Sequence, residues 1–136
     1  MNIILFIHQN SSKKGAIFKH VIDHNFNQIE IQIFQTVKAF KTRLKQALIF
    51  EKEIYIIFID SENRLKELTL LIDLLENKRI LLILPTDLSA ILSVAHQFFP
   101  RVFTFINDTY DDLCAVLTKM INQETKNIMS YGKGGN

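Results

Sequence analysis

The sequence predicts an α/β protein, a doubly wound (βα)5 three-layer sandwich whose parallel sheet has the strand order 2-1-3-4-5. Five short runs rich in β-branched and aromatic residues alternate with amphipathic segments of about 14 residues, as in successive βα units. Most of these runs are apolar throughout, which is typical of parallel strands covered by helices on both faces. The length of 136 residues suits one core of this kind.

The predicted strands span residues 3–7, 29–34, 54–59, 80–84 and 102–106. The second run, IEIQIF, alternates apolar and polar side chains, so we expect it at an edge of the sheet with one face partly exposed. Right-handed crossovers with helices on both faces then favour the order 2-1-3-4-5.

The segments between the strands have the periodicity of helices with one buried face. Their predicted apolar stripes are Ile17, Phe18, Val21 and Ile22; Val37, Phe40, Leu44, Ala47 and Leu48; Leu65, Leu68, Ile72 and Leu75; Leu88, Ile91, Leu92, Ala95 and Phe98; and Leu113, Val116, Leu117, Met120 and Ile121. The predicted N-terminal caps are Ser11 or Ser12, Thr36, Ser61, Thr86 and Asp108. The basic residues of the second helix, which we expect to form a solvated face, are Lys38, Lys41, Arg43 and Lys45.

Composition narrows the class of protein. A hydrophobic fraction of 48% with a net charge of +2 excludes a disordered chain, and no apolar run approaches the roughly 20 residues of a membrane span. The single cysteine, Cys114, favours a reducing compartment, so we expect a cytoplasmic protein without membrane contact. Charges of both signs are mixed along the chain, which disfavours nucleic-acid binding. We expect one domain over residues 1–125 and a flexible tail over 126–136.

The carboxyl ends of the strands are where chemistry is expected. In an open parallel sheet, ligands bind beyond these ends, at the point where the strand order reverses. Asp60 directly follows the third predicted strand. The other residues of the predicted pocket are His8, Gln9, Pro85, Thr86, Asn107 and Asp108.

Five βα units with an aspartate closing the third strand resemble the receiver domain of bacterial response regulators, a CheY-like variant of the flavodoxin-like fold. The resemblance covers about residues 2–125. Members of that family accept a phosphoryl group on this aspartate in two-component signal transduction. The resemblance therefore implies that Asp60 is the equivalent of the phosphoacceptor.

The other chemical positions of that family differ in this sequence. His8 and Gln9 stand where the family has an acidic pair that holds Mg²⁺, and a neutral imidazole and an amide are poor ligands for this ion. Asn107 stands where the family has a lysine, and Pro85 precedes Thr86 where a Ser or Thr ends the fourth strand. We therefore expect a pseudo-receiver that is not an enzyme, needs no cofactor or metal, and acts through protein–protein interaction.

Two alternative functions stay open. In the first, Asp60 is a working phosphoacceptor with Mg²⁺. In the second, the loop of residues 8–14, which has two serines and two lysines at a helix start, binds a phosphate or flavin as in flavodoxins. If Asp60 is structural instead, we expect it to cap the next helix or to hydrogen-bond His8.

The resemblance also implies where a partner binds. In the family, the fourth helix, fifth strand and fifth helix form the contact face for a protein partner or a second copy. The apolar candidates on that face here are Val94, Phe99, Phe103 and Tyr110. A second candidate contact is the third helix, which is apolar all round because it also carries Leu70, Leu71 and Leu74.

Overall fold

The computed structural model describes residues 1–46 and 52–134, and the side chains of residues 1–46 and 52–123. Its elements in chain order are β1 (Asn2–Ile7), α1 (Lys13–Asn25), β2 (Glu30–Phe34), α2 (Val37–Lys45), β3 (Glu53–Phe58), α3 (Glu62–Leu68), the 3₁₀ helix η1 (Thr69–Leu71), α4 (Ile72–Leu75), β4 (Arg79–Leu84), α5 (Ser89–His96), β5 (Val102–Phe105) and α6 (Asp111–Gly134). The predicted alternation of strands and helices is confirmed.

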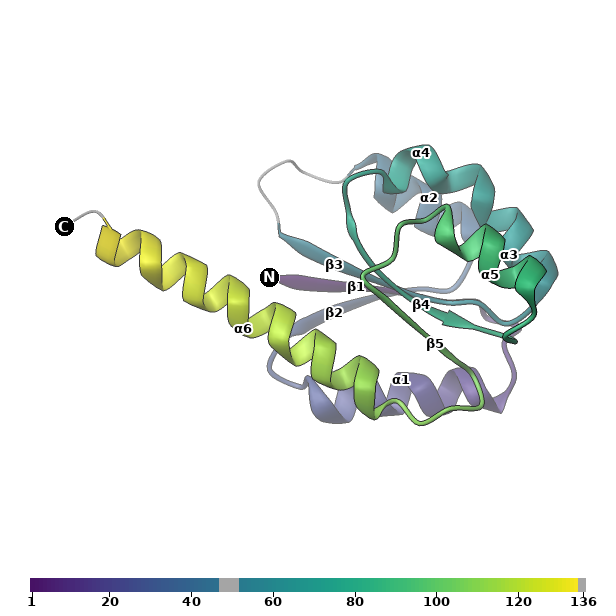
Figure 1. Ribbon diagram of the computed structural model, residues 1–136, viewed down its shortest axis with the longest axis horizontal. Coiled ribbons are helices and arrows are strands. Elements are labelled where there is room, and N and C mark those ends of the chain that lie inside the picture. Colours follow the sequence, from purple (N-terminus) through teal and green to yellow (C-terminus); the bar gives the residue numbers. More distant parts are fainter. Residues whose placement is uncertain (47–51, 135–136) are drawn as a thin grey trace.

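The five strands are parallel and lie in the order β2-β1-β3-β4-β5, so the predicted fold class and strand order are confirmed. Helices α1 and α6 cover one face of the sheet, and α2 to α5 cover the other (Figure 1). The edge position predicted for the second strand is also confirmed, because β2 pairs only with β1 and its side chains are partly exposed.

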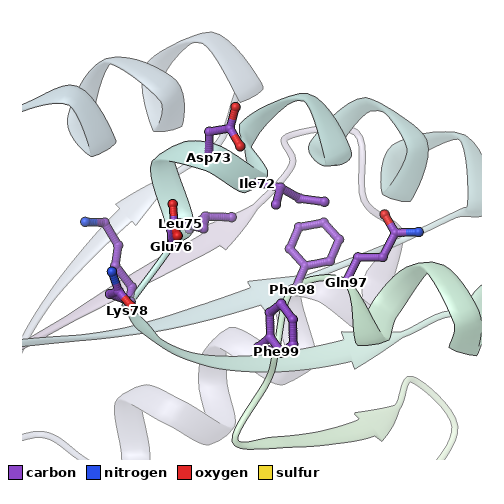
Figure 2. A pocket seen from close by; sticks show the side chains of 9 residues that line it. Ile72, Asp73, Leu75, Glu76, Lys78, Gln97, Phe98 and Phe99 are labelled. Carbon is purple, nitrogen blue, oxygen red and sulfur yellow. The ribbon is translucent and has the colours of Figure 1, made fainter.

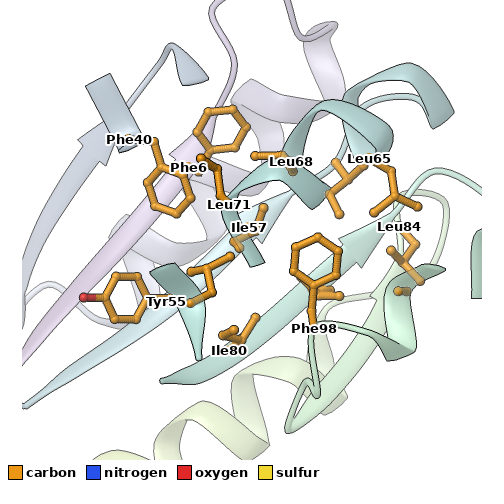
Figure 3. Close-up of a cluster of buried hydrophobic side chains, with 14 of the residues drawn as sticks. Phe6, Phe40, Tyr55, Ile57, Leu65, Leu68, Leu71, Ile80, Leu84 and Phe98 are labelled. Atoms are coloured by element: carbon orange, nitrogen blue, oxygen red, sulfur yellow. The ribbon is translucent and has the colours of Figure 1, made fainter. Parts of the chain in front are cut away.

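The core consists of two apolar layers, one on each face of the sheet. Alternate side chains of each central strand enter opposite layers, which is why these strands are apolar throughout. Figure 3 shows the layer under α2 to α5. Its largest buried side chains include Phe6, Phe40, Tyr55, Leu65, Leu68, Leu71 and Phe98.

Three predicted caps are confirmed. Ser12, Thr36 and Ser61 each accept a hydrogen bond from a backbone amide in the first turn of α1, α2 and α3. The other two predictions are wrong. Helix α5 begins only at Ser89, so Thr86 lies in the preceding loop, where its hydroxyl accepts a bond from the amide of Leu88. Asp108 likewise precedes the start of α6 by three residues.

The predicted apolar stripes need three corrections. Ile17 and Leu88 are 57% and 61% exposed, because α1 buries only the narrow stripe of Gly15, Phe18 and Ile22, and because Leu88 precedes α5. The predicted third helix is divided into α3, η1 and α4, so the helical phase shifts and Leu71 is buried. Ala47 and Leu48 of the second stripe lie outside the described residues.

Gly15 allows a close approach of α1 to the end of β1. A Cβ atom at this position would lie 2.8 Å from the Cβ of Ser11 and 3.1 Å from the Cγ2 of Ile7. Both contacts are tighter than side chains normally make. The packing of α1 against β1 therefore depends on the missing side chain.

Arg43 of α2 is mostly buried, so the prediction of a solvated face is wrong for this residue. It forms an ion pair with the buried carboxylate of Glu53, the first residue of β3, and its Nε donates to Oε1 of Gln32 at 3.2 Å. The hydroxyl of Tyr55 donates to Glu53 Oε1 at 2.8 Å. The other three basic residues, Lys38, Lys41 and Lys45, are exposed as predicted.

Helix α6 is longer than predicted. It continues to Gly134 and so includes most of residues 126–136, for which we expected a flexible tail. Its C-terminal part extends past the amino ends of the strands (Figure 1). Across the described ranges, none of the helices combines the length and apolar character that a membrane crossing requires.

Candidate functional site

The carboxyl edge, where β1, β3, β4 and β5 end, is the predicted position of the site. The backbone hydrogen bonds between strands continue up to the site residues. The amide of Ile59 donates to the carbonyl of Ile83 at 2.9 Å, and the amide of Ile106 donates to the carbonyl of Leu84 at 2.9 Å. His8, Asp60, Pro85 and Asn107 follow these four strands directly or within two residues. The fold therefore places them along one edge of the sheet, in that order.

The carboxylate of Asp60 is held by Arg64, one helical turn later in α3. Its Oδ1 lies 3.2 Å from Arg64 Nε, and the two side chains are 18% and 17% exposed. Arg64 also donates to Glu67 at 2.7 Å. Burial alone lowers the pKa of Arg64, but the hydrogen bonds and negative charges of Glu67 and Asp60 outweigh it, so the net pKa is raised. Asp60 therefore faces a permanent positive charge.

The two structural roles expected for Asp60 are not observed. Ser61 caps α3 instead, with its hydroxyl accepting from the amide of Arg64 at 3.1 Å. His8 Nδ1 accepts from the amide of Asn10 at 3.1 Å, and the part of the chain that the structure describes contains no hydrogen bond between His8 and Asp60. The physical reason is that the carboxylate of Asp60, just before α3, is already paired with Arg64 in the first turn of that helix.

A lysine from α1 reaches the carboxyl edge. The ammonium group of Lys14, in the first turn of α1, donates to the side-chain oxygen of Asn107 after β5. Nearby, the rings of Phe18 and Tyr110 lie edge to face, with 4.8 Å between the ring centres. Sequence reasoning missed this cation because Lys14 and Asn107 are 93 residues apart. The only signal was the serine- and lysine-rich helix start.

The remaining predicted pocket residues lie in surface loops. Gln9 and Asp108 are exposed and Pro85 is half-buried. In the loop between β1 and α1, the amide of Ser11 donates to the carbonyl of His8 at 2.9 Å. The buried hydroxyl of Ser11 has no hydrogen-bond partner among the described residues.

Titratable side chains away from this edge give no metal centre. Across the described residues, no group of three or more His, Cys, Asp or Glu side chains is placed to hold a metal ion. The rings of His20 and His24 stack on the exposed surface of α1, with 6.1 Å between the ring centres. Burial, and then the charge of Asp111, raise the pKa of the Cys114 thiol, so Cys114 favours its neutral form.

The candidate contact residues are not equally accessible. Val94, Phe103 and Tyr110 are half-buried, whereas Phe99 is 85% exposed. Burial, and then the charge of Asp108, raise the pKa of Tyr110, whose hydroxyl donates to the carbonyl of Ile106 at 3.1 Å. In the region of the predicted third helix, Leu70 is 82% exposed.

A groove lies at the opposite end of the sheet, the amino edge, where the strands begin. It has a volume of about 420 Å³ and lies between the end of α4 and the end of α5 (Figure 2). We call it the amino-edge groove; it is lined by Ile72, Asp73, Leu75, Glu76, Asn77, Lys78, Gln97, Phe98 and Phe99. Sequence reasoning missed it because it looked for a site only at the carboxyl edge.

Comparison with protein-family models, with curated proteins and with solved structures found no match for this chain. The arguments about function therefore depend on the geometry of the two edges.

Proposed function

We propose that this protein is a pseudo-receiver, a non-catalytic cytoplasmic domain that acts in signal transduction by binding another protein, independently of phosphorylation. The observation that supports this proposal is the ion pair between Asp60 and Arg64. It occupies the carboxylate that the receiver resemblance assigns to phosphoryl transfer.

Phosphoryl transfer to a carboxylate needs a metal ion and cations that neutralise the charge on the phosphoryl oxygens. His8 and Gln9, at the end of β1, offer an imidazole and an amide in place of carboxylates. The imidazole nitrogen Nδ1 of His8 is already used by the amide of Asn10. These contacts favour a surface that binds a partner over a centre that accepts a phosphoryl group.

The proposed contact face consists of α5, β5 and α6, the fourth helix, fifth strand and fifth helix of the receiver resemblance. β5 is an edge strand, and half-buried aromatic side chains lie along it. The ring of Phe103 lies edge to face with the rings of His96 in α5 and of Phe105, with 5.7 Å and 6.0 Å between the ring centres. Such partly exposed aromatic groups are common at the centres of protein interfaces.

A working phosphoacceptor is the second candidate function, and Lys14 favours it. Its ammonium group lies beside Asn107, where the receiver resemblance places a lysine. In this alternative, Lys14 would neutralise a phosphoryl group on Asp60, while Mg²⁺ would have to bind with few carboxylates.

Beryllofluoride, a phosphoryl mimic, separates the two candidates. We expect its addition with Mg²⁺ to leave the amide NMR spectrum of the full chain unchanged, because Asp60 is paired with Arg64. The matched control is Asp60→Asn, which cannot hold the mimic. Shifts near Asp60, Thr86 and Asn107 that occur in the unsubstituted chain and not in Asp60→Asn would establish the phosphoacceptor and overturn the pseudo-receiver.

A further inference from the structure

We propose that two copies of this chain associate reciprocally. Residues 126–136 of one copy, which comprise the C-terminal end of α6 and the two residues after it, dock in the amino-edge groove of the other copy. This inference goes beyond the proposed function, because it concerns the groove at the amino edge and the end of α6 beyond the sheet, not the face that α5, β5 and α6 form beside β4. Phe99, which the receiver resemblance placed on that face, lines this groove.

The amino-edge groove presents apolar surface to solvent. Ile72, Leu75 and Phe98 pack into the core at its base, and Phe99 is 85% exposed beside them (Figure 2). Phe99 also has a backbone φ of 49°, in the left-handed region that bulky side chains rarely adopt. An exposed aromatic ring held in this backbone conformation is a feature expected of a contact site.

The charges around the groove select the occupant. The carboxylates of Asp73 and Glu76 are on its exposed rim, whereas the ammonium group of Lys78 lies 5.7 Å from the centre of the Tyr55 ring. The rim therefore favours a basic segment with apolar side chains. Residues 126–136 fit this description, since they contain no acidic side chain and include Lys126, Ile128, Met129, Tyr131 and Lys133.

The described part of α6 leaves the core towards its C-terminal end. Met120 is buried and Ile121 is half-buried, but the next two residues, Asn122 and Gln123, are exposed. The helix then continues to Gly134, past the end of the sheet at which the groove opens (Figure 1). A helix of this kind is stabilised mainly by the packing of one of its faces. Docking on a second copy would supply such packing to the end of α6.

The arrangement requires a second copy. Helix α6 lies on the face of the sheet opposite to α4 and α5, so its straight axis leads away from the groove of its own chain (Figure 1). Two copies related by a two-fold axis would each donate one helix end and one groove. This isologous contact closes on itself and ends at the dimer.

Sedimentation velocity of the full chain over a range of concentrations tests the proposal. We expect a dimer, and we expect Phe99→Ser to weaken it by about tenfold or more because the ring is the central exposed apolar group. The matched control is Leu70→Ser, which removes an equally exposed side chain, 82% against 85%, outside the groove. The double variant Ile128→Ser/Met129→Ser should weaken the dimer as Phe99→Ser does.

A charge exchange makes the test specific. Asp73→Lys/Glu76→Lys should weaken the dimer, and adding Lys126→Glu/Lys133→Glu in the same chain should restore it. A chain that stays monomeric at submillimolar concentration would overturn the proposal, and so would equal effects of Phe99→Ser and Leu70→Ser. Loss of the dimer in Phe103→Ser but not in Phe99→Ser would also overturn it, while leaving the proposed function intact.

Discussion

The two ends of the sheet differ in how their side chains are partnered. At the carboxyl edge, polar groups pair with one another: Asp60 with Arg64, and Lys14 with Asn107. At the amino edge, one ion pair is buried, and beside α4 and α5 apolar surface is left open. The rule that ligands bind at the carboxyl ends of parallel strands therefore locates the polar edge of this protein. It does not locate the exposed aromatic ring of Phe99 at the other edge.

Backbone geometry explains part of this difference. The connections into β4 and β5 each contain a residue in the left-handed region, Asn77 with φ 65° and Phe99 with φ 49°. Asparagine adopts this region readily, because its short polar side chain forms local hydrogen bonds. Phenylalanine does not, so the amino edge carries strain at an aromatic residue that is 85% exposed.

The ion pairs at the two edges should differ most in their contribution to stability. Replacing Arg43 by Met leaves the Glu53 carboxylate buried without its cation, and we expect a loss of about 3 kcal/mol in the free energy of unfolding. Glu53 has a side chain only 3% exposed, which is why the loss should be large. Urea unfolding followed by circular dichroism measures it.

The control at the carboxyl edge is Arg64→Met. Its partner Asp60 is 18% exposed and can be solvated, so we expect a loss below about 1 kcal/mol. Equal losses in Arg43→Met and Arg64→Met would contradict the distinction between a buried and a partly exposed pair.

Replacing Phe99 by Gly should stabilise the isolated chain. Glycine adopts positive φ without a steric penalty, so the variant should gain about 1 kcal/mol in the free energy of unfolding. The measurement is thermal unfolding at a concentration too low for association. Asn77→Gly is the matched control, and it should change stability little because asparagine already tolerates this conformation. A clear loss of stability in Phe99→Gly would show that the ring packs within the monomer.

The smallest expected effect is a dependence of stability on alkaline pH. The pKa values of Cys114 and Tyr110 are raised on folding, mainly by burial. An acid of this kind stays protonated in the folded state while it ionises in the unfolded state. Its contribution to stability is complete below the unfolded pKa, about 8.5 for cysteine, and is lost as the pH rises toward the folded pKa.

Cys114→Ala should therefore show a weaker fall in the free energy of unfolding above this pH, measured by urea unfolding. An unchanged slope would contradict the assignment.

The sequence predicted the fold because the decisive signals are local. Continuous apolar runs marked the buried strands, and the alternating run at residues 29–34 marked an edge. Ser12, Thr36 and Ser61 were recognisable as caps because a cap acts within three residues of itself. The break between α3 and α4 was not recognisable, since its leucines fit a continuous helix equally well.

The site was less predictable because its contacts join distant segments. Arg43 has the spacing of a solvent-facing residue, and only the fold brings Glu53 to it. Lys14 and Asn107 meet for the same reason. The amino-edge groove forms between the end of α4 and the end of α5, which are distant in the sequence, and a sequence has no period that predicts such a place.

The missing side chain of Gly15 has a consequence for the evolution of this domain. A Cβ atom here would press on Ser11 and Ile7. Any homologous chain that keeps α1 seated this closely on β1 should keep glycine at this position. It should accept alanine only together with glycine at position 11 and a smaller side chain at position 7. A linked exchange of this kind would mark distant members of the same lineage whose surfaces have otherwise diverged.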